Sequence, residues 1–156
     1  AAEALKASDT IIGYTVYVDL VKDHFADKRF LTTPMTKEVD RCVLAFEEAK
    51  KGHVVSMICS GDAGVYGMAG LMYEVGEKYP EVELSIIPGV TAASGGAAVL
   101  GAPLIHDFCL ISLSDLLTPW EKIENGCWQR RRQTLWYVST IPPAKSAMIT
   151  WPKPVI

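Results

Sequence analysis

The sequence predicts an α/β fold, a parallel sheet with flanking helices, on two observations. Short apolar segments with strand character alternate along the chain with segments of helical periodicity. The loops between them are short and rich in glycine, as in other parallel α/β sheets. With 156 residues, the chain is long enough to build one domain with a core of its own.

The first third of the chain contains a short strand and one clear helix. Residues 1–6 are alanine-rich and are expected to be the end of a helix, and residues 14–21 have helical or mixed spacing. Residues 10–13 between them are expected to be a strand. The next helix is expected to be capped by Thr36 and to end at Gly52. Its apolar residues recur at intervals of three and four, namely Val39, Cys42, Val43, Phe46 and Ala49.

The middle of the chain repeats a strand–loop–helix order. Residues 54–59 are largely apolar and are expected to form a strand buried on both faces. A helix is expected over residues 67–78, and a helix of very small residues over 91–100. Further strands are expected at residues 84–87 and 108–113.

Composition argues against several classes of protein. The net charge of −3 gives no electrostatic indication of a nucleic-acid partner. No stretch reaches the ~18 apolar residues of a membrane span, and there is no signal peptide, so we expect a cytoplasmic protein with no membrane partner. The chain does not begin with methionine, which indicates a cut N-terminus.

The cysteines and histidines do not predict a metal site. The four cysteines contain no CxxC pair, and the histidines at positions 24, 53 and 106 are far apart in the sequence. Cys59 and Cys109 lie inside apolar runs. We therefore expect buried, reduced thiols in a cytosolic protein.

Two loops follow predicted strands and are expected to meet at one rim of the sheet, where α/β proteins bind ligands. The first, residues 60–67, contains three glycines and one acidic residue, Asp62. Asp62 could accept hydrogen bonds from the amine or hydroxyl groups of a ligand, or it could be the N-cap of the following helix. The loop has no GxGxxG and no Walker lysine. Because its carboxylate would repel phosphate, the loop suits an adenosyl amino acid with an ammonium and a sulfonium better than a dinucleotide.

The second loop, residues 88–92, opens the helix of very small residues. Small side chains allow a helix to pack closely on a sheet. They also leave a flat wall on which an adenine or methionine moiety could lie against the backbone. These two interpretations are compatible.

Four motifs together resemble the tetrapyrrole methylases. The sequence SGDAGVYGMAG at residues 60–70 resembles the Gly-Asp-Pro/Ala loop of that family, and PGVTA at 88–92 resembles its second cofactor loop. The sequences GYTVYVDL at 13–20 and ISLSDLLTPW at 111–120 are similar to the branch that methylates carbon-17 of precorrin-3B. The resemblance covers residues 1 to about 124.

The resemblance implies two α/β domains with the active site in the cleft between them. It implies S-adenosyl-L-methionine as methyl donor and transfer to carbon-17 of precorrin-3B, or of its cobalt form, with ring contraction in cobalamin biosynthesis. It implies a homodimer at full length. The alternatives are a methylase of the same pathway acting at another carbon, or a non-catalytic fragment that binds S-adenosylmethionine. The donor-binding residues that the resemblance implies are Gly61, Asp62, Ala63, Val65, Tyr66, Thr91 and Ala92.

No catalytic residue is assigned by the sequence. His106 is the histidine we would consider as proton acceptor during ring contraction. A structural or surface role for His106 is the alternative, because nothing in its spacing distinguishes it.

The two ends of the chain depart from the family pattern. The family begins with a strand and a loop that contributes to the donor site, and this chain starts after them, which would leave a gap or an exposed edge in the sheet. We expect the family's first domain over residues 1–118, and a linker and an aberrant tail over 119–156. Residues 125–156 show no clear period of 2 or 3.6, which would fit a poorly ordered extension.

A reading-frame slip near residues 125–127 would explain the tail. Joining the third base of each codon to the next two allows the shifted frame to encode Ala-Asp-Ala-Val-Val-Cys-Leu-Tyr-Asn-Pro. That stretch is similar to the helix end, strand and cofactor loop that open the family's second domain. We then expect little or no methyl transfer by this chain alone. The actual third bases test the hypothesis.

Overall fold

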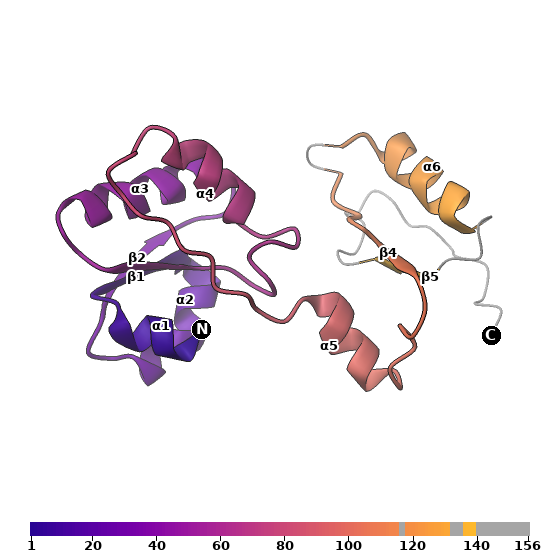
Figure 1. Cartoon of the computed structure of the whole chain (residues 1–156), viewed down its shortest axis with the longest axis horizontal. Helices are drawn as coiled ribbons and strands as arrows, with labels where there is room; N and C mark the ends of the chain where they lie inside the picture. Colours follow the sequence, from indigo (N-terminus) through magenta and orange to yellow (C-terminus); the bar gives the residue numbers. More distant parts are fainter. Residues whose placement is uncertain (116–117, 132–135, 140–156) are drawn as a thin grey trace. The chain divides into compact units, whose positions relative to one another are not determined.

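A three-stranded parallel sheet forms the centre of the first half of the chain in this computed structural model (Figure 1). The structure describes residues 1–115, 118–131 and 136–139. The strand order is β2 (Arg29–Thr33), β1 (Thr10–Tyr14) and β3 (Val55–Ile58), so β1 is central. Ile11 of β1 pairs with Phe30 on one side and Ser56 on the other, and Ile11 and Ile12 are fully buried.

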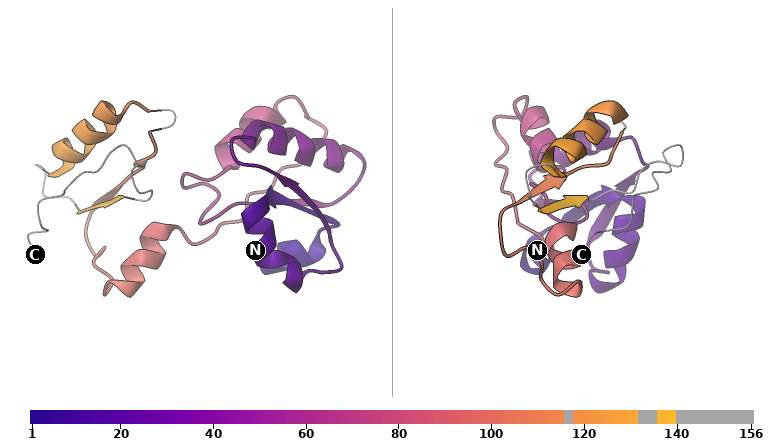
Figure 2. Two further views of the ribbon diagram at one scale, coloured as in Figure 1. Left: turned by 180° about the vertical axis from the view of Figure 1, so that it is seen from behind. Right: turned by 90° about the vertical axis from the view of Figure 1, so that its right-hand side faces the viewer.

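Helices cover both faces of this sheet. Helices α3 (Glu38–Lys50) and α4 (Ala69–Gly76) lie on one face, while α1 (Ala2–Ala7), α2 (Thr15–Val21) and a 3-10 turn, η1 (Lys22–His24), lie on the other (Figures 1 and 2). The main core lies under α3 and α4, where side chains at helical spacing meet the sheet. It contains Ile12, Cys42, Ala45, Phe46, Met72 and Val75.

The chain divides into two compact units, Ala1–Thr91 and Ala92–Ile156. The second unit contains α5 (Ala92–Val99), β4 (Phe108–Ile111), α6 (Trp120–Arg131) and β5 (Trp136–Ser139). Strands β4 and β5 pair in parallel, and α6 connects them. Its small core consists of Leu113, Ile123 and Cys127, with Ile111 and Trp120 packed against them.

The fold class is confirmed, as are most of the expected elements. The strands expected at 10–13, 54–59 and 108–113 are β1, β3 and β4, and the helices expected around them are α1 to α5. Two corrections concern local structure. Thr36 does not cap α3, because its hydroxyl donates to the Met35 carbonyl and the N-cap position is Lys37. Residues 84–87 do not form a strand, because no backbone segment among the described residues pairs with them.

Other differences concern burial and the tail. Strand β3 is half-buried rather than buried. It lies at the edge of the three-stranded sheet, and among the described strands only β1 pairs with it. Within the expected tail, residues 125–131 belong to α6 and residues 136–139 form β5, so a poorly ordered extension is wrong for these two stretches. The rest of the frame-slip stretch, residues 132–135 and 140–156, lies outside the described residues. The boundary at residue 118 stays a prediction.

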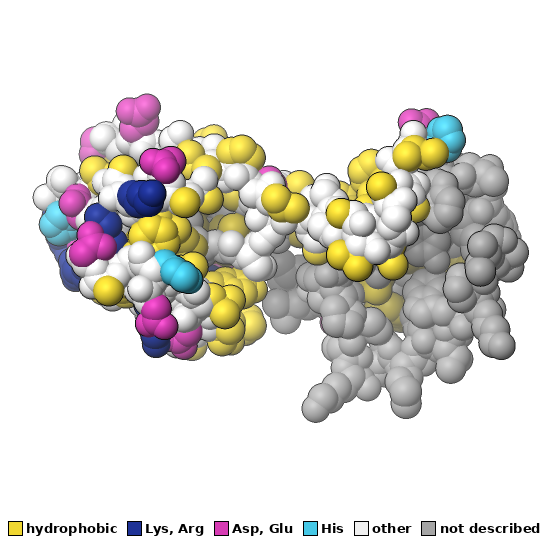
Figure 3. Space-filling model, turned by 90° about the horizontal axis from the view of Figure 1, so that it is seen from below, with side chains coloured by type: hydrophobic (Ala, Val, Ile, Leu, Met, Phe, Trp, Pro, Cys, Tyr) yellow, Lys and Arg dark blue, Asp and Glu magenta, His cyan; other side chains and the backbone are white. Residues whose placement is uncertain are grey.

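The surface and the thiols add little that restricts function. On the face shown in Figure 3, acidic and basic side chains of the first unit are interspersed. Among the residues that the structure describes, no helix is both long and apolar enough to cross a bilayer.

All four cysteines are free. Cys42 and Cys127 are buried, whereas Cys59 and Cys109 are half-buried, which corrects the expectation of full burial for these two.

Candidate donor-binding site

Asp62 connects the two glycine-rich loops that the sequence singles out. Its Oδ1 accepts a hydrogen bond from the Gly64 N–H at 2.8 Å, and its Oδ2 accepts one from the Gly89 N–H at 2.9 Å. The loop after β3 and the loop before α5 therefore meet at the carboxyl end of β3, as the order of elements predicts. Asp62 is not the N-cap of α4, since that position is Met68, with no side-chain cap.

The same two amides keep the acid charged. The N–H groups of Gly89 and Gly64, in that order of importance, hold the pKa of the Asp62 carboxyl below its ordinary value. Each carboxylate oxygen can accept more than one hydrogen bond, so both retain capacity for a ligand. The loops hold an ionised carboxylate without any lysine or arginine in residues 60–67 and 88–92. Such a site favours a cationic ligand over a phosphate.

Two glycines are required by the closeness of the loop backbones. A Cβ on Gly89 would overlap the carbonyl oxygen of Gly61, so only glycine lets the two loops come this close. A Cβ on Gly67 would lie 2.5 Å from the Asp62 carbonyl oxygen and 2.6 Å from that of Ala63. The two loops therefore approach each other closely at Gly89, and the first loop folds tightly on itself at Gly67.

The remaining predicted donor-binding residues lie on or beside these loops. Val65 donates its backbone N–H to the Asp62 carbonyl at 3.2 Å, and Ala63 accepts from the Ala69 N–H at 2.9 Å. Tyr66 has a φ of 54°, in the left-handed region that non-glycine residues seldom adopt, and its side chain is exposed. Thr91 is half-buried at the end of the second loop, and Ala92 is the first residue of α5 in the second unit.

His106, the histidine considered as proton acceptor, lies in neither of the two loops. His106 and Asp107 are exposed beside each other in the second unit, before β4, and Asp115 is exposed after it. Within the described residues, no group of three histidine, cysteine, aspartate or glutamate side chains could hold a metal ion. A role for His106 as proton acceptor therefore stays a prediction.

One polar cluster was not predicted from the sequence. Glu48 on α3 is nearly buried and accepts hydrogen bonds from Lys51 and Arg29, each at 2.7 Å. The Nδ1 atom of His53 lies 3.2 Å from Oε2 of the same carboxylate. The spacing of Glu48 and Lys51 along one helix was the available signal. Because His53 precedes β3, this cluster lies at the end of the strand opposite the two loops.

Comparison with known proteins shows the family of the chain. The family model of the tetrapyrrole (corrin/porphyrin) methylases matches residues 1–145. The chain belongs to this family. The match continues past Glu124, beyond the last of the recognisable motifs.

The curated relatives to which the chain is similar include C(17)-methyltransferases. The chain is 54% identical over 125 residues to a probable cobalt-factor III C(17)-methyltransferase of Salmonella typhimurium, covering 80% of this chain and 52% of that one. It is 44% identical over 126 residues to a precorrin-3B C(17)-methyltransferase of a Sinorhizobium species, covering 78% and 49%. The chain thus spans about half the length of these relatives.

A solved structure shows the same fold. The crystal structure of the methyltransferase CobJ superposes with a TM-score of 0.84 at 37% sequence identity. The superposition covers 94% of this chain and 62% of that one. The likeness confirms the α/β fold and the recognition of the family from its loop motifs.

Proposed function

We propose that the protein to which this sequence belongs transfers a methyl group from S-adenosyl-L-methionine to carbon-17 of precorrin-3B or its cobalt form, with ring contraction, in cobalamin biosynthesis. The names of the relatives support the reaction and the substrate class. The observation that carries the proposal for this chain is the Asp62 carboxylate, which joins two glycine loops at the carboxyl end of β3.

The loops suit the donor chemically. We propose that Asp62 and the backbone of Gly61 and Ala63 hold the ribose and methionine portion of the donor. Thr91 and Ala92 then contact it from the second loop, while Val65 and Tyr66 complete the first. The donor is already activated by its sulfonium, so the protein contributes chiefly position and alignment. An ionised carboxylate held in place by two backbone amides is suited to orient an ammonium or a pair of hydroxyls.

The setting of the reaction is also part of the proposal. Four free cysteines fit a reducing compartment, which supports a cytoplasmic location. We further propose that the protein is a homodimer at full length and acts on a small tetrapyrrole. A cobalt ion, where present, would belong to the substrate and not to the protein.

A chimera tests the reaction. The matched part of this chain replaces its counterpart in the relative from Salmonella typhimurium, and methylation of cobalt-factor III is followed with radiolabelled donor. We expect methyl transfer, and we expect Asp62→Ala in the chimera to reduce it strongly. A folded chimera that binds donor but methylates another ring position would favour a different methylase of the pathway. A folded chimera that binds donor without any transfer would favour a binding role.

A further inference from the structure

A cluster of polar and aromatic side chains lies at the carboxyl ends of β1 and β2. Tyr14 ends β1 and is paired with Thr33, which ends β2. Arg41 of α3 reaches this point, because its Nε donates to Oγ1 of Thr33 at 2.8 Å and its Nη2 donates to the Pro34 carbonyl at 3.1 Å. The strands are parallel, so the cluster lies on the same rim of the sheet as the loops joined by Asp62.

The guanidinium of Arg41 is buried without a carboxylate partner. Arg41 is 4% exposed, and both acceptors of its hydrogen bonds are neutral. Among the described residues, no ion pair includes Arg41 or its neighbour Glu38, and Asp40 pairs with Lys37. Arg41 also lies in the first turn of α3, where the helix dipole disfavours a cation. Because charged side chains are seldom buried unless they are paired, these surroundings indicate a site for an external anion.

Two tyrosine rings lie beside this guanidinium. Tyr14 and Tyr17 meet edge to face with their centroids 5.3 Å apart, and Cζ of Arg41 lies 6.0 Å from the centroid of the Tyr14 ring. Both tyrosines are half-buried. Val16 and Met35, which follow the two strand ends by two residues, have exposed apolar side chains. A buried cation beside aromatic and apolar surface suits a planar, apolar ligand that carries carboxylates.

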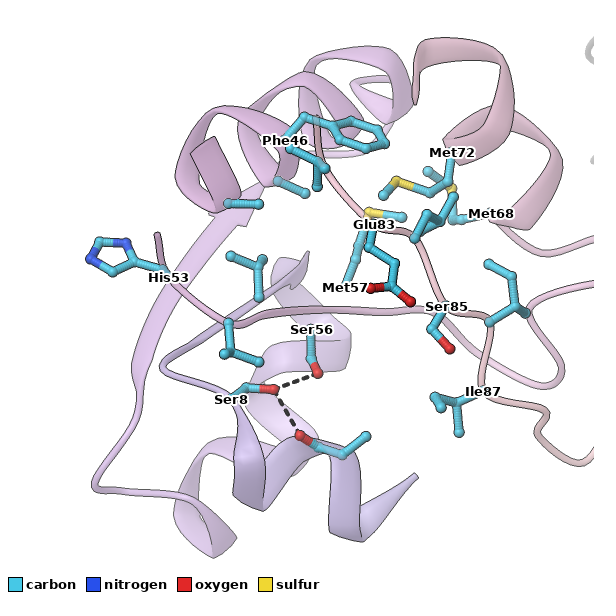
Figure 4. A pocket seen from close by; sticks show the side chains of 18 of the residues that line it. Ser8, Phe46, His53, Ser56, Met57, Met68, Met72, Glu83, Ser85 and Ile87 are labelled. Carbon is cyan, nitrogen blue, oxygen red and sulfur yellow. Dashed lines mark hydrogen bonds between the residues drawn. The ribbon is translucent and has the colours of Figure 1, made fainter. Parts of the chain in front are cut away.

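The groove drawn in Figure 4 is a different part of the first unit. It lies along β3, and Phe46, Met72 and Ser56 are among the residues that line it. Its lining includes neither Tyr14 nor Arg41. The cluster around Arg41 is therefore separate from this groove.

We propose that Arg41 binds a carboxylate side chain of the tetrapyrrole substrate, with Tyr14 and Tyr17 in contact with the macrocycle beside it. The inference rests on the proposed function, which supplies the class of ligand. Neighbouring strands lie about 5 Å apart, so the end of β2 is about 10 Å along the rim from the end of β3. A macrocycle on the tyrosines is thus close to a donor held by Asp62. Nη1 of Arg41 has no acceptor among the described residues, so its N–H groups are available to the carboxylate.

Binding of uroporphyrin to the full chain, followed by fluorescence, tests the proposal. Uroporphyrin is a tetrapyrrole with carboxylate side chains, and the control is its amide derivative, whose side chains are neutral. We expect saturable binding of uroporphyrin, and binding of the amide at least about tenfold weaker. In NMR spectra of the parent chain, the side-chain N–H signals of Arg41 should shift when uroporphyrin is added. Absent binding, equal binding of the amide, or unchanged Arg41 signals would overturn the proposal.

Two arginines at opposite ends of β2 provide matched variants. Arg29 begins the strand and pairs with Glu48, whereas Arg41 bonds to the residue that ends it. We expect Arg41→Gln to weaken uroporphyrin binding by about tenfold or more, and Arg41→Lys to weaken it less. Arg29→Gln should lower the melting temperature and leave uroporphyrin binding unchanged. Equal loss of binding in Arg41→Gln and Arg29→Gln would show that Arg41 acts on the fold alone. If Arg41→Gln does not fold, the NMR signals of the parent chain decide.

Binding of S-adenosylhomocysteine to the same proteins separates this inference from the proposed function. We expect Arg41→Gln to bind it as the parent chain does. A parent chain that binds S-adenosylhomocysteine but not uroporphyrin would overturn the role of Arg41 and leave the donor site standing. Uroporphyrin binding that depends on Arg41, in a chain that binds no S-adenosylhomocysteine, would support the role of Arg41 and contradict the donor site.

Discussion

Two carboxylates at opposite ends of β3 have lowered pKa values for different reasons. Asp62 is held by backbone amides of two loops, whereas Glu48 is held by the side chains of Lys51, Arg29 and His53. Backbone amides of both loops bond to Asp62, so Asp62 fixes the shape of the candidate donor-binding site. The charged side chains around Glu48 tie α3 to β2 through Arg29 and to the segment before β3 through His53, so the Glu48 cluster acts on stability. The same kind of pKa shift thus marks a candidate site in one place and a structural ion cluster in the other.

The largest effect is expected from separating the two loops. Gly89→Ala places a Cβ on the Gly61 carbonyl oxygen, so the loops must move apart and Asp62 loses its second amide. We expect S-adenosylhomocysteine binding to fall by about a hundredfold or more. Gly70→Ala on α4 is the control, since a Cβ there meets nothing and should stabilise the helix by about 0.5–1 kcal/mol. Equal donor binding by both variants, measured by calorimetry, would contradict the role of the loops.

Exchanging the two acids for amides should separate their roles. Asp62→Asn replaces one acceptor oxygen by a donor that faces an amide N–H, and we expect donor binding to weaken by about tenfold. Glu48→Gln should leave donor binding unchanged but lower the melting temperature by several degrees, because three basic side chains lose a charged partner. Calorimetry and thermal melts measure the two effects. If Glu48→Gln weakened donor binding as much as Asp62→Asn, the division of roles would be wrong.

Acid titration should detect the Glu48 cluster. The Lys51 ammonium first, and then Arg29, lower the pKa of Glu48 from its ordinary 4.5 to about 2. Glu48 therefore stabilises the fold fully above about pH 4.5, and this stabilisation is lost as pH falls through about 2. In denaturant melts, Glu48→Gln should be less sensitive to pH than the parent chain within this window. Identical pH profiles for the two proteins would show that Glu48 is not the group responsible.

The smallest effect concerns the partners of Glu48. Lys51 contributes most to the lowered pKa, and His53 contributes less. We expect Lys51→Met to raise the pKa of Glu48 more than His53→Gln does, and neither variant to change donor binding. Carboxyl chemical shifts followed through an acid titration measure both values. A larger change in His53→Gln would reverse the assignment.

The sequence predicted those parts of the fold that depend on the spacing of nearby apolar residues and glycines. Strand β1, helix α3 and the two glycine loops follow from apolar periodicity and glycine placement. Residues 84–87 show the limit, since an apolar run predicts an extended chain, but a strand also needs a neighbour. The Glu48 cluster was missed because Arg29 reaches it only through tertiary packing. The hydrogen bond from the Gly89 N–H to Asp62 could likewise not be predicted, because the two residues are far apart in sequence.

The central claim is that the loops joined by Asp62 hold the methyl donor. Its most direct test is a calorimetric titration of the full chain with S-adenosylhomocysteine, repeated on Gly89→Ala and Gly70→Ala. We predict saturable one-to-one binding to the parent chain and to Gly70→Ala, with binding lost in Gly89→Ala. A folded parent chain that binds no S-adenosylhomocysteine, or a Gly89→Ala variant that binds it as well as the parent, would contradict the claim.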